Sequence, residues 1–204
     1  MNANNARAFA KDLATMKWYI AVCVALFAAS AAFGASSGWL DAYLAKQIEP
    51  LRGLVERLEA MDNSQVWFFL FIFVNNFLKS LLAVFLGALF GLFPLYFVIS
   101  NGLIIGYVVS SAGAAGADVG SLIVRGLLPH GLLEVTAILI AASYGLKYGL
   151  LILAELVYAF RGRGSASALK AFHGTLGRLV VFLFFALLLA AFIESTITYM
   201  LVRG

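Results

Sequence analysis

The chain has a single cysteine, Cys23, and few charged residues, and both shortages exclude whole classes of protein. One cysteine allows neither a disulfide framework nor a thiolate metal site within the chain. Only 12% of the 204 residues are charged and 63% are hydrophobic, whereas a soluble domain carries about 25% charged residues. A soluble enzyme, a nucleic-acid-binding module and a disordered protein are therefore excluded. The mean hydropathy of +0.98 indicates an integral membrane protein.

The net charge of +4 sits in short flanks of the apolar runs, a distribution that orients a chain in a bilayer. We therefore expect the lipid bilayer as a partner and no nucleic acid. Residues 1–17 are basic, and an apolar run follows from Trp18 to about Ala35. A cleaved signal peptide is the alternative, but the run is longer than a signal core. We interpret it as a retained first span with a cytoplasmic amino terminus at the cell membrane.

Residues 36–65 form the hydrophilic stretch of the chain, where three basic residues against five acidic residues give a charge of −2. Apolar residues recur there at steps of three and four, which predicts a helix interrupted at Pro50. The stripe consists of Leu44, Ile48, Leu51, Val55 and Leu58. We expect an extracytoplasmic amphipathic helix on the membrane or the bundle. A docking surface for partners or for a second copy is the alternative.

Two further apolar runs, 66–93 and 95–112, predict the second and third spans. Each carries small residues at steps of three or four, which let another helix approach closely. The residues assigned to helix packing are Gly87, Gly91, Gly102 and Gly106. We expect these two faces to pack against each other and the glycine stripes to support a homodimer.

Residues 129–160 and 179–202 are the remaining apolar segments, separated by the basic linker 161–178. One long helix over 129–160 predicts five crossings and a cytoplasmic linker, in agreement with the positive-inside rule. Two short helices would give six crossings, and a re-entrant pair would satisfy the charges equally well. The fold expected is an all-α, polytopic transmembrane bundle of five, alternatively six, segments that forms one domain over 1–204.

Several motifs occur in an order that is typical of one membrane protein family. They are Asn75-Asn76, Asn101–Gly106 (NGLIIG), Leu128–Glu134 (LPHGLLE), Gly145–Gly149 (GLKYG) and Ala190–Thr198 (AAFIESTIT). In this order they resemble the stage II sporulation protein M family of bacteria and archaea. The resemblance covers most of the chain from Trp67 onward, although Tyr199 follows Thr198 where the family often has proline. In spore formers this family implies a membrane scaffold that holds peptidoglycan-degrading enzymes, so we expect a scaffold or assembly factor, with cell-envelope proteins as partners.

Transport is the alternative function, because polar groups inside apolar runs are costly and usually line a pathway or pair with one another. The intramembrane polar cluster expected is Asn76, Lys79, Asn101, His130 and Glu134, with Asn75, Glu155 and Glu194 as secondary candidates. Lys79 lies deep in the second span, so we expect Glu134 as its counter-charge, with Glu155 or Glu194 next. A transporter or channel for an ion or small solute would use this cluster.

His130 and Glu134 follow Pro129 at a spacing of four, so they share one helix face. Two ligands are half of a zinc site, which needs three or four from the protein. The other histidine, His173, lies in the basic linker, and no zinc-protease or nucleophile-elbow motif occurs. We therefore expect no metal, no cofactor and no enzymatic activity.

Overall fold

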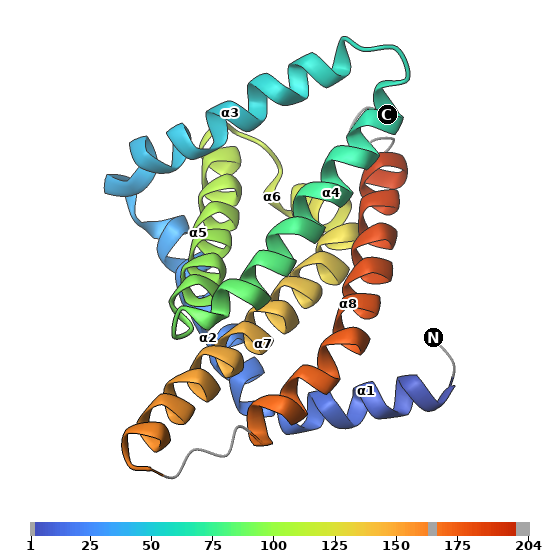
Figure 1. The fold of residues 1–204 in the computed structure, drawn as a ribbon. Helices are drawn as coiled ribbons and strands as arrows, with labels where there is room; N and C mark the ends of the chain where they lie inside the picture. The colour runs from blue at the N-terminus through green and yellow to red at the C-terminus, as the bar shows by residue number, and fades with distance from the viewer. Residues whose placement is uncertain (1–2, 163–166, 199–204) are drawn as a thin grey trace.

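The computed structural model describes residues 3–162 and 167–198, and the described chain is helical throughout, without a strand (Figure 1). Its elements are α1 (Ala3–Thr15), α2 (Lys17–Ser36), η1 (Gly38–Leu40), α3 (Asp41–Glu59), α4 (Ser64–Phe85), η2 (Leu86–Ala88), α5 (Leu92–Ala114), α6 (Val119–Ser121), η3 (Leu122–Leu127), α7 (Leu128–Phe160), α8 (Ser167–Ile193) and η4 (Glu194–Thr198). Five helical segments among the described residues are long and apolar enough to cross a membrane. The expectation of an all-α polytopic bundle with five spans is confirmed.

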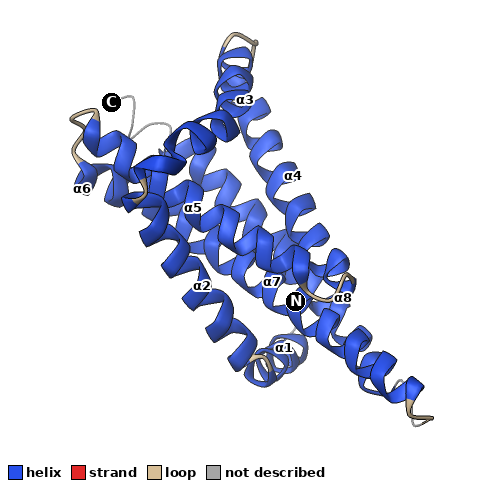
Figure 2. Ribbon diagram, turned by 90° about the vertical axis from the view of Figure 1, so that its left-hand side faces the viewer, coloured by secondary structure: helices blue, strands red, loops and turns tan. Residues whose placement is uncertain are grey.

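Two amphipathic helices lie at opposite ends of the bundle and nearly across its long axis (Figure 1). Helix α1 lies at one end, which we call the α1 end, and α3 lies at the other, the α3 end (Figure 2). Helix α1 buries Phe9, whose ring lies 5.0 Å from that of Phe182 in α8, and Met16 directly after the helix is also buried. The Arg178 guanidinium also donates a hydrogen bond to the Asp12 carboxylate at 2.7 Å. One apolar and one ionic contact therefore hold α1 against α8.

Helix α7 is continuous over 33 residues and packs against α2, α4, α5 and α8. It buries small residues such as Ala137, Ala141 and Ala142, so its neighbours approach closely. Leucines of α8, among them Leu179 and Leu183, complete the core on one side. The structure has one long helix here, so the alternatives of two short helices and of a re-entrant pair are excluded.

The glycines of α7 meet the turn between α4 and α5. A Cβ at Gly145 would collide with the Ala83 carbonyl oxygen, and one at Gly149 would collide with the Gly87 carbonyl oxygen. Gly91 has φ +79° and begins the turn into α5, a conformation that glycine adopts without steric cost. Gly87 and Gly91 therefore lie at the contact between α7 and the turn that joins α4 to α5.

The glycines of α5 pack against α2, not against α4. A Cβ at Gly102 would collide with the Ser30 hydroxyl, and one at Gly106 with the Ala31 carbonyl oxygen. The expectation that the second and third spans join through matching glycine faces is therefore wrong. Because both glycine stripes are filled within the chain, a homodimer would need a different surface.

Helix α3 runs through Pro50 without a break, which corrects the predicted interruption. Proline removes one backbone hydrogen bond, but water satisfies the freed carbonyl group where a helix is exposed. Leu44 and Leu58, near the two ends of the predicted stripe, are buried, and α3 packs on α4 and α5. The side chains of Leu51 and Val55 lie outside the described part of the structure.

The basic linker is shorter than expected, since α8 begins at Ser167 and runs to Ile193. The segment 167–178 therefore belongs to α8, and residues 163–166 lie outside the described chain. The charges and glycines of segment 167–178 hide its helical character in the sequence. Packing of Phe172 (4% exposed) against the core stabilises this part of α8.

Candidate intramembrane binding site

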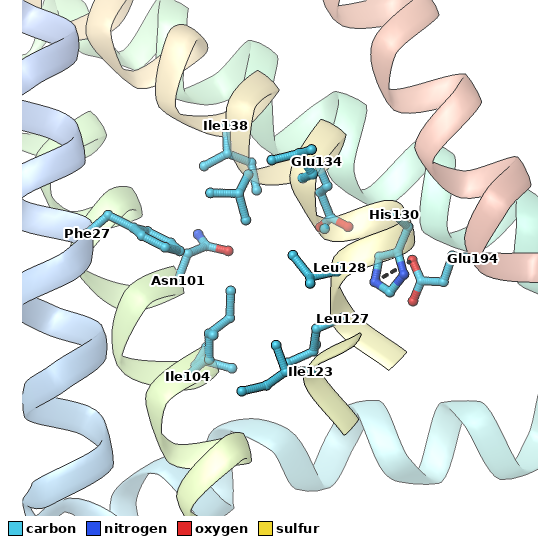
Figure 3. A pocket seen from close by; sticks show the side chains of 14 residues that line it. Phe27, Asn101, Ile104, Ile123, Leu127, Leu128, His130, Glu134, Ile138 and Glu194 are labelled. Carbon is cyan, nitrogen blue, oxygen red and sulfur yellow. Dashed lines mark ion pairs between the residues drawn. The ribbon is translucent and has the colours of Figure 1, made fainter. Parts of the chain in front are cut away.

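A cavity of about 460 Å³ opens between α2, α5, the beginning of α7 and η4 (Figure 3). It lies in the half of the bundle nearer the α3 end, where α7 begins and α8 ends (Figure 1). Isoleucine and leucine side chains form much of the wall. The polar residues of the wall are Asn101, His130, Glu134 and Glu194.

His130 and Glu134 reach the cavity because Pro129 lies in the first turn of α7. From there the spacing of four places both side chains on one face. The His130 Nε2 atom lies 3.8 Å from Oε2 of Glu194, with side chains 10% and 31% exposed. One ligand atom from each of His130, Glu134 and Glu194 falls within 4.8 Å of the others. A helix end 60 residues further along the chain thus completes this group.

Two π-helical segments lie next to these side chains. Leu122–Leu127 directly precedes α7, and Glu194–Thr198 begins with the carboxylate itself. A π-helical turn frees backbone groups and re-aims side chains, and such turns are frequent at functional sites. Gln65 at the start of α4 donates a hydrogen bond to the Ser195 carbonyl oxygen at 3.0 Å, which anchors the second of these segments.

A second cavity of about 250 Å³ lies on the α4 side of the two carboxylates, and Asn75, Asn76, Glu134 and Glu194 are among its lining residues. The Asn75 amide donates a hydrogen bond to Oδ1 of Asn76 at 3.2 Å. Asn76 in turn hydrogen-bonds with the Glu134 carboxylate. Glu134 and Glu194 therefore face both cavities, and the amide pair holds one of them.

Asn101 faces the larger cavity from α5. Its Nδ2 atom donates a hydrogen bond to the Phe97 carbonyl oxygen at 2.7 Å. Its carbonyl oxygen points into the cavity towards α7 (Figure 3). The structure thus brings together Asn76, Asn101, His130 and Glu134 of the expected cluster, with Asn75 and Glu194 from the secondary candidates.

Lys79 and Glu155 do not join this group. Lys79 is exposed on α4 and, among the described residues, makes no ion pair within 4 Å, although its charge acts on Glu134 through space. The expected Lys79–Glu134 pair is therefore absent from the described chain, because the neighbouring Ser80 takes the buried position on the helix. Glu155 lies 21 residues after Glu134, about 30 Å along a helix.

The site contains two carboxylates and an imidazole in one half-buried cluster, and these groups suit positively charged ligands. Like charges close together in a region of low dielectric repel each other, so a proton or a bound cation must lie between them. Sequence reasoning found each of these residues but missed the association of His130 with Glu194. It also missed Gln65, for which the sequence carries no signal.

The fold and this cluster define a multi-pass membrane protein with a polar site at membrane depth. Residues 20–199 match the family model of stage II sporulation protein M, so the chain belongs to that family. Comparison with curated proteins and with solved structures gave no match.

Proposed function

We propose that this membrane protein binds a small cation in the cavity beside His130 and carries it through the membrane. The observation that supports the proposal is the convergence of Glu134 and Glu194, from two different helices, on the same two cavities. A charge at the bilayer centre costs about 2.5–3.5 kcal/mol on insertion scales. Two such groups side by side are a large cost for a protein that only holds helices together.

The amides of Asn76 and Asn101 suit the same role. Asn76 holds the Glu134 carboxylate, and the Asn101 carbonyl oxygen adds a neutral oxygen to the wall of the cavity. Buried amides that served only to pair helices would bond to each other, whereas Asn101 faces the larger cavity and Asn76 faces the smaller one, and Glu134 and Glu194 line both. By the positive-inside rule the amino terminus is cytoplasmic, which places the cavity in the outer half of the membrane. The proposed role involves binding and transport, not catalysis.

A flux measurement tests this proposal. The full chain is reconstituted into liposomes that contain cation-sensitive dyes, and Na⁺, K⁺, Mn²⁺ and Zn²⁺ are added in turn. We expect uptake of at least one cation above that of protein-free liposomes, and loss of that uptake in Glu134→Gln and Glu194→Gln. Glu155→Gln is the matched control, since it removes a carboxylate from the same helix outside the cavity. Uptake no faster than in protein-free liposomes for every cation would contradict transport.

A scaffold is the second candidate, and the surface of α3 favours it. This helix lies across the α3 end of the bundle (Figure 2), where Tyr43 is 55% exposed and Lys46 and Glu49 face solvent. Such a surface suits cell-envelope partners or a second copy of this chain. Crosslinking from a photoreactive residue at position 43 in intact cells tests it. Crosslinks to lipid alone would contradict a scaffold role for α3.

A further inference from the structure

The group formed by His130, Glu134 and Glu194 has the composition of a metal site. Each side chain offers one ligand atom, and these atoms lie within 4.8 Å of one another. The first two come from adjacent turns of α7, and the third comes from η4, so three ligands approach from two directions. We propose that this group binds one divalent transition-metal ion of the Mn²⁺ to Zn²⁺ series. The inference rests on the proposed function, since it names the class of cation that the cavity takes.

The distances agree with a single ion between the three side chains. Metal–nitrogen and metal–oxygen bonds of about 2.0–2.2 Å place two ligands of one ion at most about 4.4 Å apart. The 3.8 Å between Nε2 of His130 and Oε2 of Glu194 lies within this limit. The largest separation in the group, no more than 4.8 Å, closes with small rotations of the glutamate side chains.

The charges favour a dication. Two carboxylates and a neutral imidazole carry a charge of −2, which a divalent ion neutralises, whereas a monovalent ion would leave one negative charge uncompensated. Apolar side chains form much of the cavity wall, and in such a region of low dielectric a neutral complex is the most stable one.

The ligand types favour a transition metal over Mg²⁺ or Ca²⁺. The alkaline-earth ions prefer sites made of oxygen atoms, whereas an imidazole nitrogen suits Zn²⁺ and Fe²⁺ and carboxylates suit Mn²⁺. One nitrogen and two carboxylates therefore select the middle of the first transition series.

The surroundings provide the two other features of a working metal site. The cavity of about 460 Å³ beside the group has room for water at open coordination positions. Asn76 hydrogen-bonds with Glu134, and such support of a ligating carboxylate fixes its orientation. Asn76 is therefore a positioning residue for the proposed site.

Titration of the purified full chain with Co²⁺ tests the proposal, because the visible spectrum of Co²⁺ reports nitrogen and oxygen ligation. We expect saturable binding of one Co²⁺ per chain, in competition with Zn²⁺ but not with an equal concentration of Mg²⁺. His130→Gln and Glu194→Gln should weaken binding by about tenfold or more, and Asn76→Ala by a smaller factor. The Glu155→Gln control should bind Co²⁺ as the original chain does. Circular dichroism of each variant checks that the bundle is still folded.

Two outcomes would overturn the site: no Co²⁺ spectrum at all, or equal binding by His130→Gln, Glu194→Gln and the Glu155→Gln control. The outcome also separates the site from the proposed function. Binding of Co²⁺ by the three side chains without flux of any cation would support the site and contradict transport. Flux of Na⁺ or K⁺ without Co²⁺ binding would support transport and contradict the metal site.

Discussion

Gln65 at the start of α4 donates a hydrogen bond to the carbonyl oxygen of Ser195, 130 residues further along the chain. The bond joins the beginning of the second span to the π-helical turn that carries Glu194. A π-helical turn leaves carbonyl groups without their usual partners, and one of them is satisfied here by a side chain. The position of Glu194 relative to His130 therefore depends on a residue outside the cavity.

Substitution of Gln65 by alanine tests this dependence. Loss of one neutral hydrogen bond should cost about 1 kcal/mol of stability, and the looser turn should weaken Co²⁺ binding. Thermal unfolding and Co²⁺ titration of the same sample measure both effects. Gln47→Ala is the control, because the Gln47 amide donates its hydrogen bond to Tyr43 within the exposed helix α3. Equal effects of the two substitutions on Co²⁺ binding would show that Gln65 has no positioning role.

The glycine contacts of α7 give a prediction about stability. Gly145→Ala and Gly149→Ala should each destabilise the protein by about 1–3 kcal/mol, because the added methyl group would overlap backbone atoms of α4 and the following turn. Gly174→Ala is the matched control in α8, where a Cβ meets nothing within 4 Å. Alanine there should be neutral or stabilising, since it is the better helix former. Thermal unfolding in detergent measures all three, and an unchanged midpoint for Gly145→Ala would contradict the close contact.

The ion pair between Asp12 and Arg178 predicts a local effect on α1. The two side chains are 17% and 31% exposed, so breaking the pair should cost only about 1 kcal/mol or less. Asp12→Asn should therefore leave the midpoint of unfolding nearly unchanged while it speeds hydrogen exchange in α1. The exchanged pair, Asp12→Arg with Arg178→Asp, should restore slow exchange. If Asp12→Asn leaves exchange in α1 unchanged, Phe9 and Met16 alone hold the helix.

Membrane orientation is open to a direct measurement. In a chain without Cys23, a cysteine at position 62 should be labelled by an impermeant reagent from outside the cell. A cysteine at position 167 should be labelled only after the membrane is permeabilised. The expectation follows from the excess of basic residues near the α1 end. The opposite labelling pattern would place the cavity in the inner half of the membrane.

Much of the fold is predictable from the sequence because apolar runs and helical spacing are local signals. The shared face of His130 and Glu134 follows from Pro129 and a spacing of four, and the single helix α7 agrees with the crossing number that the positive-inside rule favours. The partners of the glycines are not local: α5 packs on α2, whereas small residues alone say only that some helix comes close. Pairing therefore cannot be deduced from stripes of this kind.

The candidate site was only half predictable for a related reason. Glu194 was visible as a costly charge in the last span, but its distance from His130 depends on the π-helical turns at both segments. Such turns leave no pattern in the sequence, since they depend on how neighbouring helices pack. The exposure of Lys79 depends equally on which residue of α4 faces α7, and one helical step of about 100° separates it from buried Ser80.

The last prediction concerns Lys79, for which two interpretations predict different effects of removing its charge on stability and on cation binding. If Lys79 were the buried counter-charge of Glu134, Lys79→Gln would leave a carboxylate unpaired and cost several kcal/mol of stability, about 3–5 by analogy with broken buried pairs. In the structure Lys79 is exposed and acts on Glu134 only through space. Removal of its charge should therefore change stability little. It should also tighten cation binding, because one positive charge no longer repels the bound ion.

A repulsion of roughly 0.6–1.4 kcal/mol corresponds to about a threefold to tenfold change in affinity. We expect Lys79→Gln to lower the Co²⁺ dissociation constant by such a factor and Lys79→Arg, which keeps the charge, to leave it unchanged. If Lys79→Gln unfolds at a much lower temperature and binds Co²⁺ more weakly, the result would support a buried Lys79–Glu134 pair and contradict the exposed position of Lys79 on α4.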